Sequence, residues 1–258
     1  MNTSAQGLRV LVTAGAAGIG RVIAQTFVEH GARVHICDVD TEALTQMKSL
    51  APSVTQTVAD VASLADVDGL FADVATHLGG LDVLVNNAGI AGPTAKVEDI
   101  RPEDWDRCIA VDLNGMFYVT RKAMPLIKAA GGGSIVNLSS AAGRLGFPRR
   151  TPYAAAKWAV VGFTKSLAIE AGPEKVRVNC IQPGLVAGDR INRVIEARAK
   201  SKGISFEQER EESLAAVSLR TFVTAQDIAN MALFVSTEAG KNITGQALSV
   251  CGDHQHLS

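Results

Sequence analysis

Short apolar runs rich in β-branched residues alternate along the chain with longer stretches that have a helical pattern of apolar and polar positions. The short runs predict strands at residues 8–13, 34–38, 54–58, 81–86, 134–139, 176–181 and 247–250. Helices are predicted between the first strands, over residues 18–30, 41–50 and 63–78. Almost continuously apolar strands are typical of a parallel sheet buried under crossover helices. The pattern therefore predicts an α/β fold, a doubly wound parallel sheet of about seven strands with helices on both faces.

A single domain is expected over residues 1–258, because no Pro/Ser-rich linker or charge run divides the chain. Hydrophobic residues make up 47% and charged residues 20%, which is enough apolar material for one buried core. One segment departs from the alternation of strands and helices. Residues 189–214 are highly charged, low in β-branched residues and helical by propensity. We expect this segment, taken as 188–215, to act as a lid over the substrate.

Charge and composition exclude several classes of function. The net charge of −1 offers no basic surface for nucleic acid. No apolar run reaches the length of about 18 residues that a membrane span needs, and the N-terminus lacks the pattern of a signal peptide. We therefore expect a cytoplasmic protein with no membrane partner. The four cysteines are widely spaced, without a C-x-x-C pair or zinc-like histidine spacing, so we expect reduced thiols and no metal site.

Polar and glycine-rich motifs directly follow several of the predicted strands. Right-handed crossovers bring the carboxyl ends of parallel strands to one edge of the sheet, and ligands bind beyond that edge. The motifs are the glycine-rich turn 13–20, Asp38, residues 86–89, Ser139 with Ser140, and Pro183 with Gly184. Their convergence predicts one binding crevice.

The turn from Thr13 to Gly20 has the pattern of a dinucleotide-binding site. It follows the first strand and opens the first helix, so its amides can meet a pyrophosphate at a helix N-terminus. The predicted cofactor-binding residues in this turn are Thr13, Gly15, Gly18, Ile19 and Gly20.

Asp38 ends the second predicted strand, eighteen residues beyond Gly20. A carboxylate at this point accepts hydrogen bonds from both ribose hydroxyls and repels a 2′-phosphate, so Asp38 favours NAD over NADP as the cofactor. The opposing interpretation uses Arg21 or Arg33 as a partner for that phosphate. Asp60 and Val61 follow the third strand and are placed beside an adenine ring, although they could instead only cap the next helix.

Tyr153 and Lys157 stand four residues apart, with Ser140 thirteen residues before Tyr153. Residues i and i+4 of a helix share one face. A phenol titrates at about 10 when unperturbed, and a neighbouring cation lowers that pKa. The predicted catalytic group therefore has Tyr153 as general acid and base, Lys157 as the cation that tunes it and holds the nicotinamide ribose, and Ser140 as the residue that orients the substrate oxygen.

These motifs resemble those of the short-chain dehydrogenase/reductase family, in its compact subclass, over essentially the whole chain. The family's Tyr-x-x-x-Lys motif matches Tyr153 and Lys157, and its Asn-Asn-Ala-Gly motif matches residues 86–89. Its Pro-Gly turn matches Pro183 and Gly184. The resemblance implies a Rossmann-like sheet of seven strands and a homotetramer. It also implies cofactor contacts from Asn87, Tyr153, Lys157 and Val186.

Three positions depart from the family pattern. The first glycine of the turn is Ala14, and we expect Gly15 to absorb the turn instead. The fourth catalytic position, an asparagine in the family, is Asp112, whose backbone carbonyl could still hold the water that reaches the lysine. The favoured alternative is that Asp112 occupies a kinked, solvated turn and leaves the chemistry unchanged. The threonine that binds the carboxamide in the family is Gly188.

Arg144 and Arg190 are the candidate substrate-binding residues outside the catalytic group. The guanidinium fork recognises carboxylates and phosphates through paired hydrogen bonds, and both arginines flank the predicted crevice. The alternative, which is the more common outcome, is that these are surface arginines, some paired with Asp189, Glu196 or groups of a neighbouring subunit.

The sequence predicts an NAD-dependent oxidoreductase that transfers a hydride between the nicotinamide and a secondary alcohol or carbonyl of a small molecule. A sugar, a polyol or a hydroxy acid would suit this chemistry. The nearest alternative is an NADPH-dependent ketone or 3-oxoacyl reductase, against which Asp38 argues. A second alternative is a non-catalytic NAD-binding sensor or scaffold, against which Ser140, Tyr153 and Lys157 argue.

Overall fold

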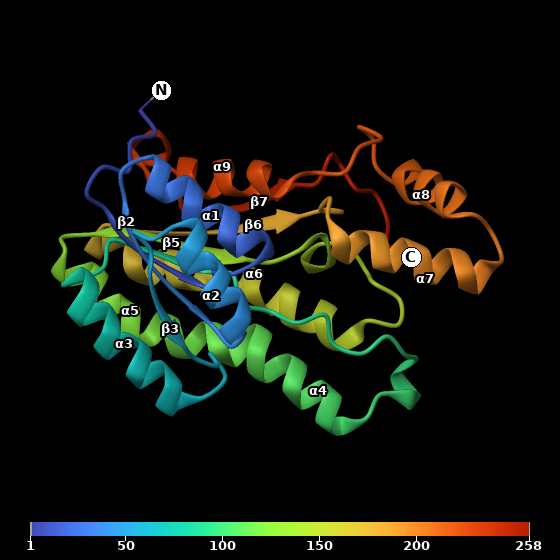
Figure 1. The fold of residues 1–258 in the computed structure, drawn as a ribbon, viewed down its shortest axis with the longest axis horizontal. Coiled ribbons are helices and arrows are strands. Elements are labelled where there is room, and N and C mark those ends of the chain that lie inside the picture. The colour runs from blue at the N-terminus through green and yellow to red at the C-terminus, as the bar shows by residue number, and fades with distance from the viewer. Residues whose placement is uncertain (1, 258) are drawn as a thin grey trace.

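A single parallel sheet forms the centre of the molecule (Figure 1). The computed structural model describes residues 2–257, apart from the side chains at positions 189, 190, 197 and 201. The strands are β1 (Arg9–Thr13), β2 (Arg33–Asp38), β3 (Thr55–Val58), β4 (Val83–Asn86), β5 (Gly133–Leu138), β6 (Val176–Pro183) and β7 (Ala247–Val250). Their order across the sheet is β3-β2-β1-β4-β5-β6-β7, and neighbouring strands pair in parallel. The predicted sheet of about seven parallel strands is confirmed.

Helices cover both faces of this sheet (Figure 1). They are α1 (Gly18–Glu29), α2 (Thr41–Leu50), α3 (Leu64–Leu78), α4 (Pro102–Ile109), α5 (Met116–Ala129), α6 (Thr151–Ala171), α7 (Asp189–Lys202), α8 (Phe206–Ala215) and α9 (Ala225–Ser236). Helices α1, α2 and α9 pack on one face, and α3, α5 and α6 pack on the other. Within residues 2–257, no helix has both the length and the apolar character that crossing a membrane requires.

Strand β1 shows why its sequence is almost continuously apolar. Successive side chains of a strand point to opposite faces. Val10 and Val12 lie in the core beneath α1 and α9, where they join Phe27, whereas Leu11 lies in the opposite core with Leu70 of α3. All five side chains are 0% exposed. Because both faces are covered, a polar residue at any of the three central positions would lose apolar contact area.

The strand order reverses between β1 and β4, which places the crevice for a ligand beyond the carboxyl ends of these two strands. The helices that leave this edge begin at polar caps. Asp40 caps α2 by accepting hydrogen bonds from the amides of Glu42 and Ala43. Ser63 caps α3 by accepting from the amide of Asp66. The alternative that Asp60 and Val61 cap α3 is therefore wrong, because Ser63 fills that position.

The charged segment after β6 is helical, as predicted, and forms α7 and α8. The two helices lie at one end of the molecule, outside the layers that cover the sheet (Figure 1). Lys202, in the last turn of α7, joins them through its Nζ, which lies 2.6 Å from Glu209 Oε2 and 2.7 Å from Glu212 Oε2. Glu209 is 2% exposed, so this contact compensates a buried charge. The role of the segment as a lid stays a prediction.

His35 is a buried titratable group in the middle of β2. Its two ring nitrogens hydrogen-bond with the hydroxyls of Thr55 and Thr57, at 2.7 and 2.9 Å. The ring also stacks on His77 of α3, with the ring centroids 5.6 Å apart. Burial, together with repulsion by His77, lowers the pKa of His35 to about 4, and the charge of Asp73 opposes both effects. The folded protein therefore holds this imidazole neutral near neutral pH.

Acidification should destabilise the fold through His35. The unfolded chain binds this proton near pH 6.5 and the folded chain only near pH 4, so stability is complete above the unfolded value and falls as the pH drops toward the folded one. The loss between about pH 7.5 and about pH 5 should be on the order of 2 kcal/mol. Urea unfolding of the wild type and of His35→Asn at both pH values measures it. Equal pH slopes for the two proteins would show that His35 is not responsible.

Candidate active site

The glycine-rich turn connects β1 to α1 at the edge where the crevice lies. A Cβ atom on Gly20 would stand 2.1 Å from the carbonyl oxygen of Ala14 and 2.5 Å from Nδ2 of Asn87, so only glycine fits there. Gly15 is similarly confined, since a Cβ would stand 2.6 Å from a methyl carbon of Ile36. The helix thus approaches the turn as closely as the backbone allows. Its first amides have no partner inside the helix, and they lie at the crevice.

Ala14 corrects one expectation about this turn. Its φ of 48° lies in the left-handed region, whereas Gly15 is not among the residues with positive φ. Ala14 therefore makes the turn itself, and Gly15 does not absorb it. An alanine in this region costs roughly 1 to 2 kcal/mol of backbone strain. The sequence could not reveal this because either residue could have adopted the turn.

Thr13 and Asn87 join the ends of β1 and β4. The Thr13 hydroxyl accepts hydrogen bonds from the amides of Asn87 and Ala88, both at 3.0 Å. In return, the Asn87 Nδ2 donates to the carbonyl oxygens of Thr13 and Ala14, also at 3.0 Å. Thr13 is 1% exposed. Both side chains therefore hold the frame of the predicted cofactor site, and Asn87, half-buried, remains at its border.

Asp38 lies against the glycine-rich turn, where the sequence placed it. Its Oδ2 accepts a hydrogen bond from the amide of Ala16 at 3.1 Å, and its Oδ1 accepts from the amide of Asp40 at 3.2 Å. The side chain is only half-buried. A carboxylate oxygen accepts more than one hydrogen bond, so these contacts orient the group and still leave room for a ribose hydroxyl.

Asp60 and Val61 lie at the next strand end. Asp60 Oδ2 accepts a hydrogen bond from Arg107 Nη2 at 2.9 Å, and its Oδ1 accepts from the amide of Ala62. Val61 is 6% exposed and packs against Gly115, where a Cβ would stand 2.6 Å from a methyl carbon of the valine. Asp60 thus forms an ion pair with Arg107 at this edge. Val61 packs its side chain against Gly115.

Tyr153 and Lys157 share one face of α6, one turn apart, as the spacing predicted. Lys157 Nζ lies 5.5 Å from the centroid of the Tyr153 ring, and the Arg150 guanidinium lies 5.6 Å from it. Lys157 is 4% exposed and donates to the carbonyl oxygen of Leu138 at 3.2 Å, which ties the lysine to the end of β5. Two cations therefore lie within 6 Å of the centre of the Tyr153 ring.

Ser139 and Ser140 have different surroundings at the end of β5. Ser139 is 5% exposed, and its hydroxyl donates to the carbonyl oxygen of Lys157 at 2.8 Å, so it fastens β5 to α6. Ser140 is half-buried, and its Oγ accepts from the amide of Ala142 at 3.2 Å. Of the two serines, Ser140 is the less buried.

Asp112 does not occupy a solvated turn, and that interpretation is wrong. It lies in a π-helical segment, Ala110–Gly115, between α4 and α5, and it is 2% exposed. Its Oδ1 accepts a hydrogen bond from the amide of Ile90 at 2.6 Å. Its Oδ2 lies 3.3 Å from Lys157 Nζ, within ion-pair distance but without the geometry of a hydrogen bond. A carboxylate buried beside a buried ammonium is compensated by that charge.

Cys108, on α4, is affected by the charges of Asp112 and Lys157. Burial, together with the charge of Asp112, raises the pKa of the Cys108 thiol to about 11, and Lys157 and Arg150 oppose this. The thiol is 0% exposed. Its sulfur would lie 3.0 Å from a Cβ on Gly92. The charges of Asp112, Lys157 and Arg150 therefore all act on the thiol of Cys108.

Val186 and Gly188 follow the Pro-Gly turn. Val186 forms an isolated parallel bridge with Val223, supported by the Ala187 amide donating to the Val223 carbonyl at 2.8 Å. Gly188 has a φ of 141° and is the N-cap of α7, without a side chain to offer. Any contact of this turn with a nicotinamide carboxamide would therefore use backbone groups.

Arg144 and Arg190 are the two arginines predicted to bind the substrate. Arg144 Nη2 donates to the carbonyl oxygen of His254 at 2.6 Å and contacts the Cys251 sulfur at 3.3 Å. This guanidinium therefore holds the C-terminal segment through a backbone carbonyl, and its role in substrate binding stays a prediction. The side chain of Arg190 lies outside the described residues. His254 is 3% exposed, and burial is the main cause of its lowered pKa.

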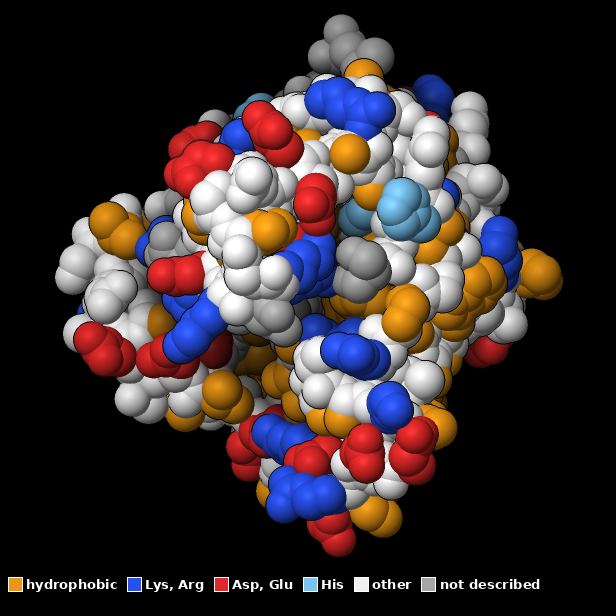
Figure 2. Space-filling model, turned by 90° about the vertical axis from the view of Figure 1, so that its right-hand side faces the viewer, with side chains coloured by type: hydrophobic (Ala, Val, Ile, Leu, Met, Phe, Trp, Pro, Cys, Tyr) orange, Lys and Arg blue, Asp and Glu red, His pale blue; other side chains and the backbone are white. Residues whose placement is uncertain are grey.

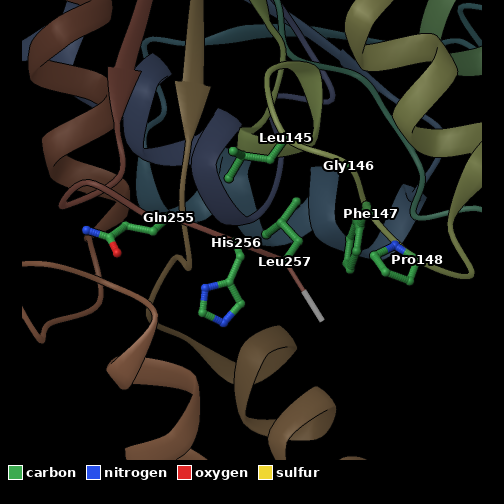
Figure 3. Close-up of a pocket in the computed structure, with 7 residues that line it drawn as sticks. All are labelled: Leu145, Gly146, Phe147, Pro148, Gln255, His256 and Leu257. Carbon is green, nitrogen blue, oxygen red and sulfur yellow. The ribbon is translucent and has the colours of Figure 1, made fainter.

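A cavity of about 380 Å³ lies between the loop that follows β5 and the C-terminal segment, and none of Ser140, Tyr153 and Lys157 is among its lining residues (Figure 3). Its lining comes from the loop between β5 and α6 and from the C-terminal segment: Leu145, Gly146, Phe147, Pro148, Gln255, His256 and Leu257. Arg150 connects it to the phenol, because its guanidinium lies 5.3 Å from the Phe147 ring centroid and 5.6 Å from that of Tyr153. The face of the molecule that carries α7 and α8 is hollowed, with lysine and arginine side chains beside the hollow (Figure 2).

The chain matches known proteins over nearly its whole length. A family model described as Enoyl-(Acyl carrier protein) reductase matches residues 14–252. The D-beta-hydroxybutyrate dehydrogenase of Rhizobium meliloti (strain 1021) is 34% identical over 249 residues, which cover 94% of this chain and 96% of that protein. The chain belongs to the short-chain dehydrogenase/reductase family.

Two solved structures of this family share the fold. A variant of actinorhodin polyketide ketoreductase with NADPH has a TM-score of 0.90 and 32% identity, and the match covers 95% of this chain and 96% of that one. An NAD+-bound xylitol dehydrogenase has a TM-score of 0.90 and 26% identity, and the match covers 98% of this chain and 100% of that one. This chain is thus an oxidoreductase of a family that uses a nicotinamide cofactor. Of these two solved structures, one contains NADPH and the other contains NAD+.

The glycine-rich turn fits the pyrophosphate of such a cofactor. The N-cap of α1 is Ala17, whose methyl side chain cannot bond the first amides of the helix. The first turn of α1 also contains no acidic residue. Those amides and the positive end of the helix dipole thus face the crevice, which suits an anion. Among the described residues, no group of three or more His, Cys, Asp or Glu is arranged to hold a metal ion.

Sequence reasoning missed the contribution of Phe147 and Leu257 to the cavity, and the closeness of Arg150 to the phenol. Arg150 stands three residues before Tyr153, which is a helical neighbour spacing and could have suggested the contact. Leu257 carried no such signal, because its place depends on how the C-terminal segment folds back over the loop.

Proposed function

We propose that this protein is an NAD-dependent dehydrogenase that oxidises a secondary alcohol of a small molecule, or reduces the corresponding carbonyl. The observation that carries the proposal is the shared edge of the sheet. Tyr153, with Lys157 Nζ 5.5 Å from its ring, lies at the same edge as Asp38 and the glycine-rich turn. A proton-transfer group and a dinucleotide site at one edge are the two halves of hydride transfer.

The residues have separable roles in this reaction. A bound nicotinamide cofactor would supply the hydride chemistry, in which the alcohol carbon would lose a hydride or the carbonyl carbon would gain one. In oxidation, the Tyr153 phenolate accepts the proton of the substrate hydroxyl, and in reduction the phenol donates it back. Lys157 stabilises the phenolate by its charge, and the half-buried Ser140 donates or accepts a hydrogen bond at the substrate oxygen.

The substrate we favour is a small hydroxy acid or polyol with an apolar portion. The cavity of about 380 Å³ has the size of a small-molecule site, and Leu145, Phe147 and Leu257 make it mainly apolar. Relatives named for hydroxybutyrate, galactitol and xylitol support substrates of this size. The NADPH-dependent ketone or 3-oxoacyl reductase remains the alternative, supported by the ketoreductase with NADPH and by a relative named 3-oxoacyl-[acyl-carrier-protein] reductase. The cytoplasmic location stays a prediction.

Asp38 should give a preference for NAD over NADP of at least about tenfold in kcat/KM, because charged hydrogen bonds contribute roughly 1.5–3 kcal/mol and the carboxylate repels a 2′-phosphate. Asp38→Asn should reduce this ratio by about tenfold while keeping an oxygen for the Ala16 amide. Asp40→Asn is the matched control, because asparagine also caps a helix, and its ratio should change little. Initial rates with both cofactors measure this. A strong preference of the wild type for NADP would overturn the assignment.

Tyr153→Phe should reduce kcat by at least about a hundredfold, the lower range for general acid-base catalysis, while the Kd for NADH changes little. The control is Tyr118→Phe, which removes the other of the two tyrosines of the chain, on α5. Assays over hydroxy acids and polyols, together with NADH fluorescence titration, separate the two readouts. Cofactor binding without turnover of any substrate by the wild type would instead support the sensor or scaffold alternative.

We further propose that the protein assembles as a homotetramer through the outer faces of α5 and α6. Trp158 and Ile169 of α6 are 52% and 81% exposed, and they stand eleven residues apart, which is three helical turns on one face. Phe117 of α5 is 46% exposed. Exposed apolar side chains gathered on neighbouring helices are typical of subunit contacts.

Replacing Trp158 and Ile169 with glutamate should therefore split the assembly, because each charge would have to be buried in the contact. Light scattering of the wild type should give four times the chain mass of 27.0 kDa, and the variant should give less. Leu50→Glu is the control, since Leu50 is also exposed, at 59%, but ends α2 on the other face. A monomeric wild type would contradict the proposal.

A further inference from the structure

Asp112 stands where the family has an asparagine, and the substitution changes the charge beside Lys157. An amide at this position would leave the ammonium with neutral neighbours. The carboxylate instead lies 3.3 Å from Lys157 Nζ, and both groups are almost completely buried, at 2% and 4% exposure. Charges interact most strongly where water is excluded. The pair therefore has an electrostatic effect that the backbone relay of the family does not account for.

The Asp112 carboxylate is held in place by the backbone. Its Oδ1 accepts the hydrogen bond from the Ile90 amide at 2.6 Å. The π-helical segment at 110–115 fixes its Cα between α4 and α5. Oδ2 has no hydrogen-bond partner among the described residues, and its compensation comes from the ammonium alone.

The groups that face the Tyr153 phenol come from several elements. Lys157 lies one turn along α6, and Arg150 precedes α6, each less than 6 Å from the ring centroid. Asp112 reaches the lysine from the π-helical segment, and the neutral Cys108 lies behind it on α4. The Leu138 carbonyl of β5 accepts a hydrogen bond from Lys157. Asp112 is thus the carboxylate that balances these cations.

We propose that Asp112 is a positioning residue that holds Lys157 by a buried ion pair and offsets part of its charge. Tyr153 then takes up the substrate proton at a higher pH than it would with an asparagine at position 112. The proposal rests on the proposed function. The physical reason is that a carboxylate beside the ammonium weakens the stabilisation that the ammonium gives to the phenolate. Oxidation needs the phenolate and reduction needs the phenol, so Asp112 moves the pH profiles of both directions to higher pH and leaves the equilibrium of the reaction unchanged.

The reaction balances without any further group. In oxidation, the O–H proton of the alcohol passes to the Tyr153 oxygen, and the C–H bond breaks with its electron pair transferred as hydride to the nicotinamide. The alcohol becomes a carbonyl, the cofactor is reduced, and the proton later leaves Tyr153 for solvent. Asp112 takes no part in these bonds and acts only through Lys157.

Asp112→Asn should therefore shift the acid limb of the pH profile of kcat/KM for oxidation to lower pH, by roughly one unit, which is about tenfold in rate below the midpoint. The alkaline limb of reduction should move in the same direction by a similar amount. The matched control is Asp68→Asn on α3, whose side chain is 61% exposed and pairs with Lys122. It removes the same charge far from Tyr153 and should leave both limbs in place.

A direct titration makes the test independent of turnover. The chain has two tyrosines, so Tyr118→Phe leaves Tyr153 as the sole source of tyrosinate absorbance. The midpoint of that absorbance should lie at lower pH in Tyr118→Phe/Asp112→Asn than in Tyr118→Phe alone. An unchanged midpoint, or a shift to higher pH, would overturn the proposal, as would a uniform loss of rate with an unmoved profile. Absence of turnover in the wild type would instead contradict the proposed function, and the titration would still decide the role of Asp112.

Discussion

The hydrogen bonds between Thr13 and Asn87 tie together the ends of β1 and β4, the two strands between which the order of the sheet reverses. At such a point the connections leave in opposite directions, and a crevice opens between them. The Thr13 hydroxyl and the Asn87 amide close that junction from inside, and the same amide restrains the carbonyl of Ala14. The crevice and the turn that borders it therefore depend on one set of side chains.

The sheet transmits this geometry to the catalytic group. β5 lies next to β4, and its end is fastened to α6 by the Ser139 hydroxyl and by the Leu138 carbonyl, which both bind Lys157. Lys157 is in turn held by Asp112 from the π-helical segment. A chain of short-range contacts thus runs from the strand end to the lysine and leaves the half-buried Tyr153 facing the crevice.

The sequence allowed the fold to be predicted and candidate site residues to be named, because both depend on local patterns. Apolar runs predicted the strands, and the spacing of Tyr153 and Lys157 predicted their shared helix face. It could not predict contacts made between distant segments. Counting located Asp112, but its burial against Lys157 depends on how the segment between α4 and α5 packs. Arg144 likewise carried no signal that its partner would be a carbonyl 110 residues away.

The π-helical segment has a consequence for how the chain can change. Its wider turn lets α4 and α5 follow one another with a fixed offset, and each residue of a helix turns the chain by about 100°. A π-helical residue turns the chain by less than that, so removing a single residue from this segment would convert it to ordinary α-helix and leave α4 and α5 close to their present register. The tighter constraint on this segment is residue type, because Asp112 is buried against Lys157 and a Cβ on Gly115 would stand 2.6 Å from a methyl carbon of Val61.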